Sequence, residues 1–310
     1  MLAMHAEVLR TIRDIKSLKI QGARNIARSA IEAMISEARG SKAASSRTLC
    51  TELKTTGKQL AGSRPTEPMM RNSIDEMARF LEKRMEEGAG ARQLRSEIVE
   101  FGSVQLKRMK EDAEKLALYG AELIPNKALV LTHCHSSTAT AILRKAKEMK
   151  KKFSVVACET RPRYQGRITA QELANAGIDI TLVVDGAANM FMKKADLCLV
   201  GADSITSKGD LINKVGTSMI AHLARMHDVS FFSAAELSKF SPHTMYGVRE
   251  KIEERNPAEV WERPPRKVKV RNPAFDVTAS SYISGYITEL GVIPPQSFFA
   301  LAAQKLGIEI

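Results

Sequence analysis

A cysteine between two histidines is the strongest candidate for chemistry in this sequence. Cys134 follows a short apolar run, residues 128–132, and lies between His133 and His135. At the end of a strand in an open α/β sheet, the crevice binds ligands, and the free N–H groups of the next helix favour an anion there. The helix dipole and two imidazoles are expected to lower the pKa of the thiol towards reactivity. A small buried side chain at a strand end is the alternative interpretation.

Four further groups of polar residues follow apolar runs or turns. They are residues 159–166, Asp185, Asp203, and the pair Asn213 and Lys214, which is expected to open a helix. The carboxyl ends of parallel strands meet at one edge of a sheet, so these groups are expected to join Cys134 in one crevice. A thiol, a carboxylic acid and cations together make an acid/base pair with a phosphate site. Taken singly, Asp203 is also typical of a helix N-cap and Asp185 of a turn.

Two patterns of apolar residues divide the chain. From residue 5 to about residue 119 they recur three or four apart, which predicts helices with breaks at residues 40–46 and 62–68. Beyond residue 126, short apolar runs alternate with helical segments, which predicts a parallel sheet covered on both faces. The runs are residues 128–132, 153–157, 178–184, 197–200 and 229–232. The predicted fold class is α/β: an N-terminal helical domain, residues 1–124, followed by a Rossmann-like parallel-sheet domain, residues 125–310.

Composition limits the classes of partner. The net charge of +12 favours an anionic partner. The basic residues are spread widely without interleaved aromatics, so nucleic-acid binding is not predicted. Four cysteines without a C-x-x-C pair indicate reduced thiols in a cytoplasmic protein. The sequence predicts no membrane segment, no dinucleotide site of the G-x-G-x-x-G type and no metal site, since no second Cys or His pair accompanies His133 and His135.

Several motifs in order along the chain resemble one superfamily. It contains methylthioribose-1-phosphate isomerases, archaeal ribose-1,5-bisphosphate isomerases, and the α, β and δ regulatory subunits of eukaryotic translation initiation factor 2B. The motifs are Ser-Arg-Pro-Thr at residues 63–66, Thr-His-Cys at 132–134, Glu-Thr-Arg-Pro at 159–162, Gly-Ala-Asp-Ser-Ile at 201–205, Asn-Lys-Val-Gly-Thr at 213–217 and Asn-Pro-Ala-Phe-Asp-Val-Thr at 272–278. The resemblance implies this fold, but part of the superfamily is catalytic and part is not.

The resemblance also implies which residues act. In the isomerases the motif cysteine and aspartate are the catalytic pair, which corresponds to Cys134 and Asp203. The substrate-binding residues that it implies are Gly22, Ala23, Arg24 and Arg64 from the helical domain, and His135, Ser136, Ser137, Gln165, Asn213, Lys214 and Lys239 from the α/β domain. The site is therefore expected between the domains.

The motif details favour one isomerase. Methylthioribose-1-phosphate isomerases typically carry Cys-Asn-x-Gly and Gly-Ala-Asp-Arg-Ile, whereas residues 134–137 read Cys-His-Ser-Ser and residues 201–205 read Gly-Ala-Asp-Ser-Ile. Hydroxyl and imidazole donors at a helix start suit a second phosphate. The predicted substrate is ribose-1,5-bisphosphate and the product ribulose-1,5-bisphosphate, in nucleotide salvage. Asp203 is expected to protonate the ring oxygen and Cys134 to remove the C2 proton; a hydride shift is the competing route.

Cofactors and assembly are also expectations from the resemblance. The resemblance implies that the chemistry needs no cofactor and that adenosine monophosphate (AMP) is an allosteric activator. It also implies a homodimer that builds a hexamer as a trimer of dimers. Apolar residues near the C-terminus, among them Tyr282, Tyr286, Phe298 and Phe299, are expected to form the interface or, alternatively, ordinary core. A methylthioribose-1-phosphate isomerase and a non-catalytic, initiation factor 2B-like regulatory subunit remain the alternatives.

Overall fold

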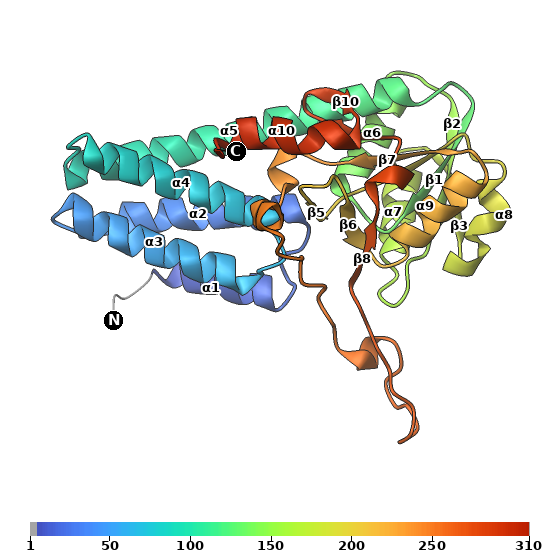
Figure 1. Cartoon of the computed structure of the whole chain (residues 1–310), viewed down its shortest axis with the longest axis horizontal. Helices are drawn as coiled ribbons and strands as arrows, with labels where there is room; N and C mark the ends of the chain where they lie inside the picture. Colours follow the sequence, from blue (N-terminus) through green and yellow to red (C-terminus); the bar gives the residue numbers. More distant parts are fainter. Residues whose placement is uncertain (1–4, 310) are drawn as a thin grey trace. The chain divides into compact units, whose positions relative to one another are not determined.

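The first part of the chain folds into helices, as its apolar spacing predicts. The structure, a computed structural model, describes residues 5–309. The helices of this part are α1 (Ala6–Lys16), α2 (Ala23–Gly40), α3 (Ser46–Ser63), α4 (Pro68–Glu86) and α5 (Ala91–Leu123) (Figure 1). Both predicted breaks are confirmed. Ser45 caps α3 by accepting the N–H of Thr48 at 3.1 Å, and Pro68 occupies the first turn of α4, where its missing N–H costs nothing.

The chain divides into two units, each with its own core. One contains the described residues up to Glu111 together with Leu306–Ile308, and the other contains Asp112–Lys305. The predicted boundary after residue 124 falls at the end of α5, whereas the units divide inside this helix. The core of the first unit consists mainly of Ile, Leu, Met and Ala side chains, such as Ile26, Met34 and Met70.

A mostly parallel, seven-stranded sheet forms the centre of the second unit. Its strands are β1 (Ala128–His133), β2 (Phe153–Cys158), β3 (Asp179–Val183), β4 (Leu197–Val200), β7 (Ser230–Ala234), β9 (Gly285–Thr288) and β10 (Gly291–Ile293). The order is β10-β9-β7-β4-β1-β2-β3, and only β10 runs antiparallel to its neighbour. All five predicted strands are present, and the predicted α/β class is confirmed. The carboxyl ends of β1, β2, β3 and β4 therefore meet at one edge.

Helices connect these strands and cover the sheet. They are α6 (Ser137–Glu148), α7 (Gln165–Asn175), α8 (Ala188–Met192), α9 (Thr217–Met226) and α10 (Pro295–Leu306). Helix α7 packs against β2 and β3, while α9 packs against β4 and β7. Nowhere in residues 5–309 does a helix combine the length and apolarity that a membrane crossing requires.

A second, three-stranded antiparallel sheet corrects one sequence prediction. It consists of β5 (Ser204–Ile205), β6 (Leu211–Lys214) and β8 (Phe275–Thr278) in the order β5-β6-β8. Asn213 and Lys214 therefore end a strand and do not open a helix, because β6 pairs with residues some 60 positions later, Asn213 with Asp276 and Lys214 with Phe275. Such long-range pairing leaves no local signal in the sequence.

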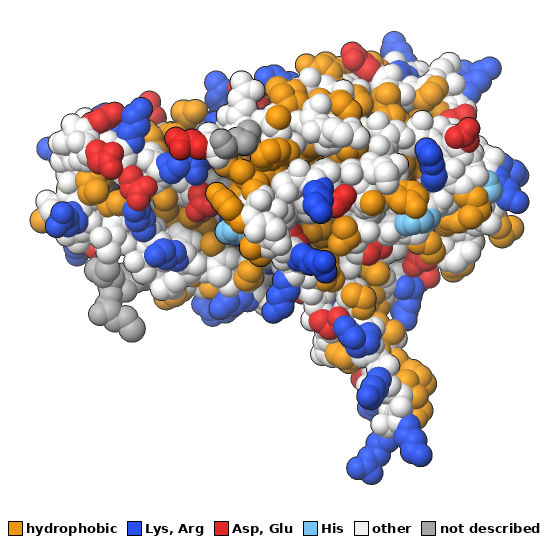
Figure 2. Space-filling model, viewed as in Figure 1, with side chains coloured by type: hydrophobic (Ala, Val, Ile, Leu, Met, Phe, Trp, Pro, Cys, Tyr) orange, Lys and Arg blue, Asp and Glu red, His pale blue; other side chains and the backbone are white. Residues whose placement is uncertain are grey.

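The segment of residues 250–274 forms an arm that folds back on itself. At its base Glu254 bridges Pro273, and the N–H of Arg255 donates to the carbonyl of Asn272 at 2.9 Å. The turn η4 (Pro257–Glu259) follows, and most residues beyond it are exposed, as the charge and proline content of residues 250–269 predicts. Figure 1 shows the arm extending away from the sheets, and Figure 2 shows basic and apolar side chains gathered on it.

The apolar residues near the C-terminus are mostly core. Tyr286 and Phe298 are completely buried and pack edge to face with ring centroids 4.9 Å apart. The Tyr286 hydroxyl donates to the carbonyl of Gly209 at 2.9 Å. Tyr286 and Phe298 are therefore ordinary core and not part of an interface with a second copy.

Candidate active site

Two threonine hydroxyls hold Cys134 directly after β1. Its backbone is in the left-handed region with φ 66°, which is uncommon for a residue other than glycine. Its N–H donates to Thr160 Oγ1 at 2.8 Å, and its carbonyl accepts from Thr169 Oγ1 at 3.0 Å. Thr160 follows β2 and Thr169 lies in α7, so the predicted position of Cys134 at the carboxyl end of the sheet is confirmed.

The predicted lowering of the thiol pKa is wrong. Burial raises the pKa of Cys134 to about 11, and the charge of Lys214 lowers it by less than burial raises it. Burial also lowers the pKa of His133, so this imidazole is neutral at neutral pH and adds no positive charge. Its Nε2 donates to the carbonyl of Val215 at 2.9 Å, while His135 Nδ1 lies 3.1 Å from Thr169 Oγ1. Desolvation therefore outweighs the expected effect of the two imidazoles.

Asp203 reaches the same neighbourhood from the end of β4. Its N–H donates to the carbonyl of Ile212 at 3.0 Å, so it leads into the small sheet and does not cap a helix. The negative charge of its carboxylate raises the pKa of the Cys134 thiol and also that of the Lys214 amine. Coulombic interactions weaken with distance, so the three side chains lie in one neighbourhood. The thiol, the carboxylate and the amine therefore form one group.

Lys214 is a buried cation at the end of β6. Its Nζ donates to the carbonyl of Ala274 at 3.1 Å and lies 4.8 Å from the centre of the Phe275 ring. Burial lowers the pKa of its amine, and the like charge of Arg255 lowers it further. An anion beside these cations would offset the cost of burying them.

A small pocket of about 10 Å³ borders Lys214. Its walls come from the loop before α7, from the end of β6 and from the base of the arm, and include Gln165, Lys214, Arg255, Glu259 and Asn272. Gln165 Oε1 is buried and accepts no hydrogen bond from any residue that the structure describes. An orphaned acceptor of this kind suits a hydroxyl or N–H of a ligand. Asn213 is also buried, and its side-chain amide donates to Thr217 Oγ1 at 3.0 Å.

The start of α6 follows Cys134 within three residues. Ser136 is its N-cap and accepts the N–H of Ala139 at 3.3 Å, while Ser137, the first helical residue, is exposed. Gly201 at the end of β4 is required by close packing, because a Cβ there would lie 2.4 Å from Ser136 Oγ. His135, Ser136 and Ser137 therefore follow Cys134 along the same edge of the sheet.

The remaining predicted residues have other surroundings. Lys239 is buried in η2 (Leu237–Lys239), and its Nζ lies 3.3 Å from a carboxylate oxygen of Glu236. Gly22 precedes α2, whose first residues are Ala23 and Arg24, and Arg64 ends α3. Gly22, Ala23, Arg24 and Arg64 belong to the N-terminal unit, so it stays a prediction that they join the site residues of the second unit.

Sequence reasoning missed Arg255 and Thr169, and it placed Thr160 near Cys134 only as one of residues 159–166. The charge of Arg255 acts on both Cys134 and Lys214. It comes from the base of the arm, which the charge and proline content of residues 250–269 predict to be an exposed excursion. A signal was available for Thr160, which lies two residues after β2 inside the motif at residues 159–162, whereas Thr169 looks like an ordinary helical residue.

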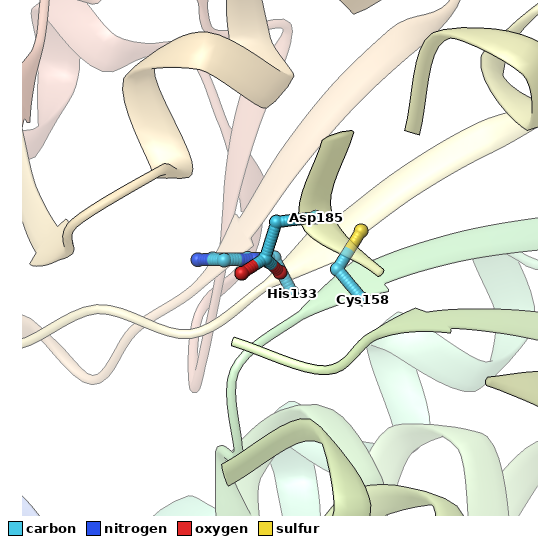
Figure 3. A group of neighbouring side chains, drawn as sticks. All are labelled: His133, Cys158 and Asp185. Carbon is cyan, nitrogen blue, oxygen red and sulfur yellow. The ribbon is translucent and has the colours of Figure 1, made fainter. Parts of the chain in front are cut away.

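His133, Cys158 and Asp185 also lie together at this edge, and their potential ligand atoms are within 4.8 Å of one another (Figure 3). The donor types suit a transition metal, but a tetrahedral zinc site brings its ligand atoms to about 3.3–3.8 Å from each other. Here the two carboxylate oxygens of Asp185 each accept a backbone N–H at 2.8 Å, from Thr160 and from Arg161. The described geometry thus gives this carboxylate a structural role.

Comparison with known proteins places the chain in a family. Residues 19–295 match the Initiation factor 2 subunit family, and the chain belongs to it. It is 38% identical over 314 residues to a ribose 1,5-bisphosphate isomerase of Thermococcus kodakarensis, with 99% of this chain and 97% of the relative covered. It is 37% identical to a methylthioribose-1-phosphate isomerase of Desulforamulus reducens, with 91% and 86% covered. The predicted family is therefore confirmed.

Solved structures agree on the fold. The translation initiation factor eIF-2B of Pyrococcus horikoshii OT3 superposes with a TM-score of 0.80 at 32% identity, covering 94% of this chain and 98% of that one. The 5-methylthioribose 1-phosphate isomerase of the same organism gives 0.75 at 30% identity, covering 97% and 87%. Since isomerases and initiation factors share this fold, function has to be argued from the site.

Proposed function

We propose that the chain is an aldose–ketose isomerase that converts ribose-1,5-bisphosphate to ribulose-1,5-bisphosphate in AMP salvage. The observation that carries the proposal is the convergence of Cys134, Asp203 and Lys214 at the carboxyl ends of the strands. The similarity to proteins named ribose 1,5-bisphosphate isomerase over nearly the whole chain supports the choice of substrate.

The substrate requires an acid and a base. A phosphate on the anomeric oxygen prevents ordinary opening to a free aldehyde, so a proton has to be delivered to the ring oxygen. Asp203 donates that proton, and Cys134 as thiolate removes the C2 proton. The resulting phospho-enol takes the abstracted proton from Cys134 at C1, and its C2 hydroxyl returns a proton to Asp203, which leaves the 2-ketose. Substrate, product and protein contain the same atoms after one cycle.

The raised thiol pKa bears on how this pair shares its protons. At neutral pH a group with a pKa of about 11 is protonated, so Cys134 has to pass its proton to Asp203 before it acts as a base. Lys214 stabilises the thiolate through its positive charge. The raised pKa also favours a second assignment, in which the Cys134 thiol is the acid and the Asp203 carboxylate is the base. Both assignments use one proton shared by the pair.

Two regions of the site are assigned to the phosphates. We assign one phosphate to the start of α6, where Ser136 and Ser137 lie at the positive end of the helix dipole. Lys214 and Lys239 provide charge for phosphate, while Gln165 and Asn213 bind sugar hydroxyls. Gly22, Ala23, Arg24 and Arg64 are assigned to the substrate as the resemblance implies.

A turnover assay tests the proposal. Purified protein is incubated with ribose-1,5-bisphosphate or with methylthioribose-1-phosphate, with and without AMP, and the ketose product is measured. We expect ketose from the bisphosphate, more of it with AMP, and none with the Cys134→Ser variant. Turnover of methylthioribose-1-phosphate alone would instead support that isomerase, which the relative from Desulforamulus reducens favours as second candidate. No turnover of either sugar would favour a regulatory binding protein of the initiation-factor type.

Assembly and location belong to the same proposal. We propose a homodimer that builds a hexamer, in the cytoplasm, with no cofactor in the chemistry and AMP as activator. The cysteines Cys50, Cys134, Cys158 and Cys198 are all free, which fits a reducing compartment. Light scattering checks the assembly, and a monomer at micromolar concentration would contradict it.

A further inference from the structure

A relay of hydrogen bonds joins the carboxyl ends of three neighbouring strands around Cys134. Asp185 follows β3, and its two oxygens accept the N–H groups of Thr160 and Arg161, both at 2.8 Å. The Thr160 hydroxyl then accepts the N–H of Cys134 at 2.8 Å and donates to the carbonyl of Cys158 at 3.0 Å. Each strand end is thereby tied to the next, from β3 through β2 to β1.

The other polar backbone group of Cys134 is held from a helix. Thr169 Oγ1 in α7 donates to the carbonyl of Cys134 at 3.0 Å. Since that hydroxyl proton is used, His135 Nδ1 at 3.1 Å donates to the same oxygen. Both Thr160 and Thr169 are almost completely buried. The N–H and the carbonyl of Cys134 are thus each fixed by a buried threonine hydroxyl.

Two residues of this relay adopt an unfavourable backbone conformation. Cys134 has φ 66° and Thr160 has φ 65°. A positive φ is rare for any residue with a Cβ and rarer for a β-branched one such as threonine. Conformations of this kind persist only where the surroundings impose them, and they cluster at functional sites. The hydrogen bonds of Thr160, Thr169 and Asp185 supply that constraint.

We infer that Thr160, Thr169 and Asp185 are positioning residues that fix the left-handed backbone of Cys134 and so aim its thiol at the reacting sugar. The expected loss of kcat rests on the proposed isomerase function, whereas the positioning of the Cys134 backbone does not. Thr160 is the central member, because its hydroxyl contacts the Cys134 backbone and its own N–H is held by Asp185. Of the three side chains labelled in Figure 3, Asp185 belongs to this frame, through its bonds to the N–H groups of Thr160 and Arg161.

The test compares Thr160→Val, Thr160→Ser and a matched control, Thr288→Val. Thr288 is also completely buried, and its hydroxyl likewise accepts a backbone N–H, from Leu290 at 3.1 Å, and donates to a carbonyl, of Gly291 at 2.9 Å. It lies at the end of β9, which β7 and β4 separate from β1 in the sheet. Thr160→Val should lower kcat for ribose-1,5-bisphosphate by about 100-fold, the effect of misplacing a reacting group by about 1 Å, with KM changed less than about threefold. Thr160→Ser should restore most of the kcat, and Thr288→Val should leave it unchanged.

Alkylation of Cys134 by iodoacetamide, followed by peptide mass spectrometry, provides a readout independent of isomerisation. Release of the Cys134 backbone exposes the thiol, so its pKa falls from about 11 towards the ordinary value and alkylation becomes faster. We expect faster alkylation of Cys134 in Thr160→Val, with wild-type rates in Thr160→Ser and Thr288→Val. If the wild type isomerises neither sugar, the proposed function fails while this arm still tests the positioning.

Several results would overturn the inference. One is a Thr160→Val variant with wild-type kcat and a wild-type alkylation rate. Another is an equal loss of kcat in Thr288→Val, which would indicate general destabilisation. If Thr160→Val does not fold, Asp185→Asn takes its place, because the amide nitrogen cannot accept the N–H of Arg161 or Thr160. We again expect a lower kcat and faster alkylation of Cys134. Wild-type values of both in Asp185→Asn would contradict the relay.

Discussion

The thiol side and the cationic side of the candidate site are built in different ways. On the thiol side, Cys134, Thr160 and Asp185 follow three neighbouring parallel strands, and short hydrogen bonds tie the strand ends together. On the cationic side, Lys214 and Arg255 are held by antiparallel pairing between segments far apart in sequence. The thiol side is formed by the ends of neighbouring parallel strands. The cationic side forms only when β8 pairs with β6 and the arm folds back on itself. Loss of the thiol side should therefore affect mainly the chemical step, whereas loss of the cationic side should weaken binding and also destabilise the Cys134 thiolate.

The largest effect is expected for Cys134→Ser on the thiol side. A serine hydroxyl is barely ionised at neutral pH and is a weaker acid than a thiol, so either assignment of Cys134 predicts a loss. Turnover of ribose-1,5-bisphosphate should fall by about 10²- to 10⁴-fold, while calorimetry should detect little change in substrate affinity. Cys50→Ala, at a buried cysteine of α3, is the control and should retain turnover. Near-normal turnover of Cys134→Ser would remove this residue from the mechanism.

Asp203→Asn tests the partner of the thiol. The amide keeps the size of the side chain but neither donates nor accepts the catalytic proton, so turnover should fall by about 10²-fold or more. Affinity for the bisphosphate should stay similar or increase, because a negative charge is removed. If binding weakened and kcat stayed constant, Asp203 would be a binding residue only.

Lys214→Met tests the cationic side. Loss of a charge-assisted contact to phosphate should weaken binding of the bisphosphate by about 10- to 150-fold. The Cys134 pKa should rise further, because the charge that lowers it is gone, so alkylation at a given pH should become slower. Lys305→Met is the control, since this lysine pairs with Asp112 and Glu289 and should affect stability without affecting binding. Unchanged affinity in Lys214→Met would contradict the division of labour between the two sides.

A pH experiment tests how the cationic side is anchored. Asp276 in β8 accepts the N–H of Gly216 at 2.7 Å and that of Ser218 at 3.2 Å at the start of α9, and burial raises its pKa from 3.8 to about 6. Because the folded pKa is the higher one, its contribution to stability is present below about pH 4 and is lost as the pH rises through 6. Relative to Asp276→Asn, the wild type should therefore lose a few °C of Tm between pH 4 and pH 6.5. Parallel Tm curves would contradict the raised pKa.

The smallest effect is expected at the exposed start of α6. Ser137→Ala removes one neutral hydroxyl donor and should weaken binding of ribose-1,5-bisphosphate about two- to tenfold. Methylthioribose-1-phosphate should be nearly unaffected if Ser137 contacts the phosphate that this sugar lacks. Equal losses for the two sugars would move the phosphate assignment elsewhere.

The same two sides explain which features the sequence could predict. Apolar runs followed by polar residues are local signals, so the position of Cys134 and Asp203 at strand ends followed from them. The pairing of Asn213 with Asp276 joins residues some 60 positions apart, and without it Lys214 was assigned to a helix start. The thiol pKa could not be predicted either, because it depends on the balance between burial and the charges of Lys214, Asp203 and Arg255. Composition likewise could not separate an interface from a core at Tyr286 and Phe298.

Proton transfer between Cys134, Asp203 and a bisphosphorylated ribose is tested most directly by following the hydrogen at C2 of the sugar. Wild-type protein is incubated with ribose-1,5-bisphosphate in deuterium oxide, and the product is followed by proton and carbon NMR. We predict ribulose-1,5-bisphosphate that carries solvent deuterium at C1, because the proton removed from C2 exchanges before C1 is protonated. Ketose that retains the original C2 hydrogen at C1 would contradict proton transfer and favour a hydride shift, and no ketose at all would contradict the proposed function.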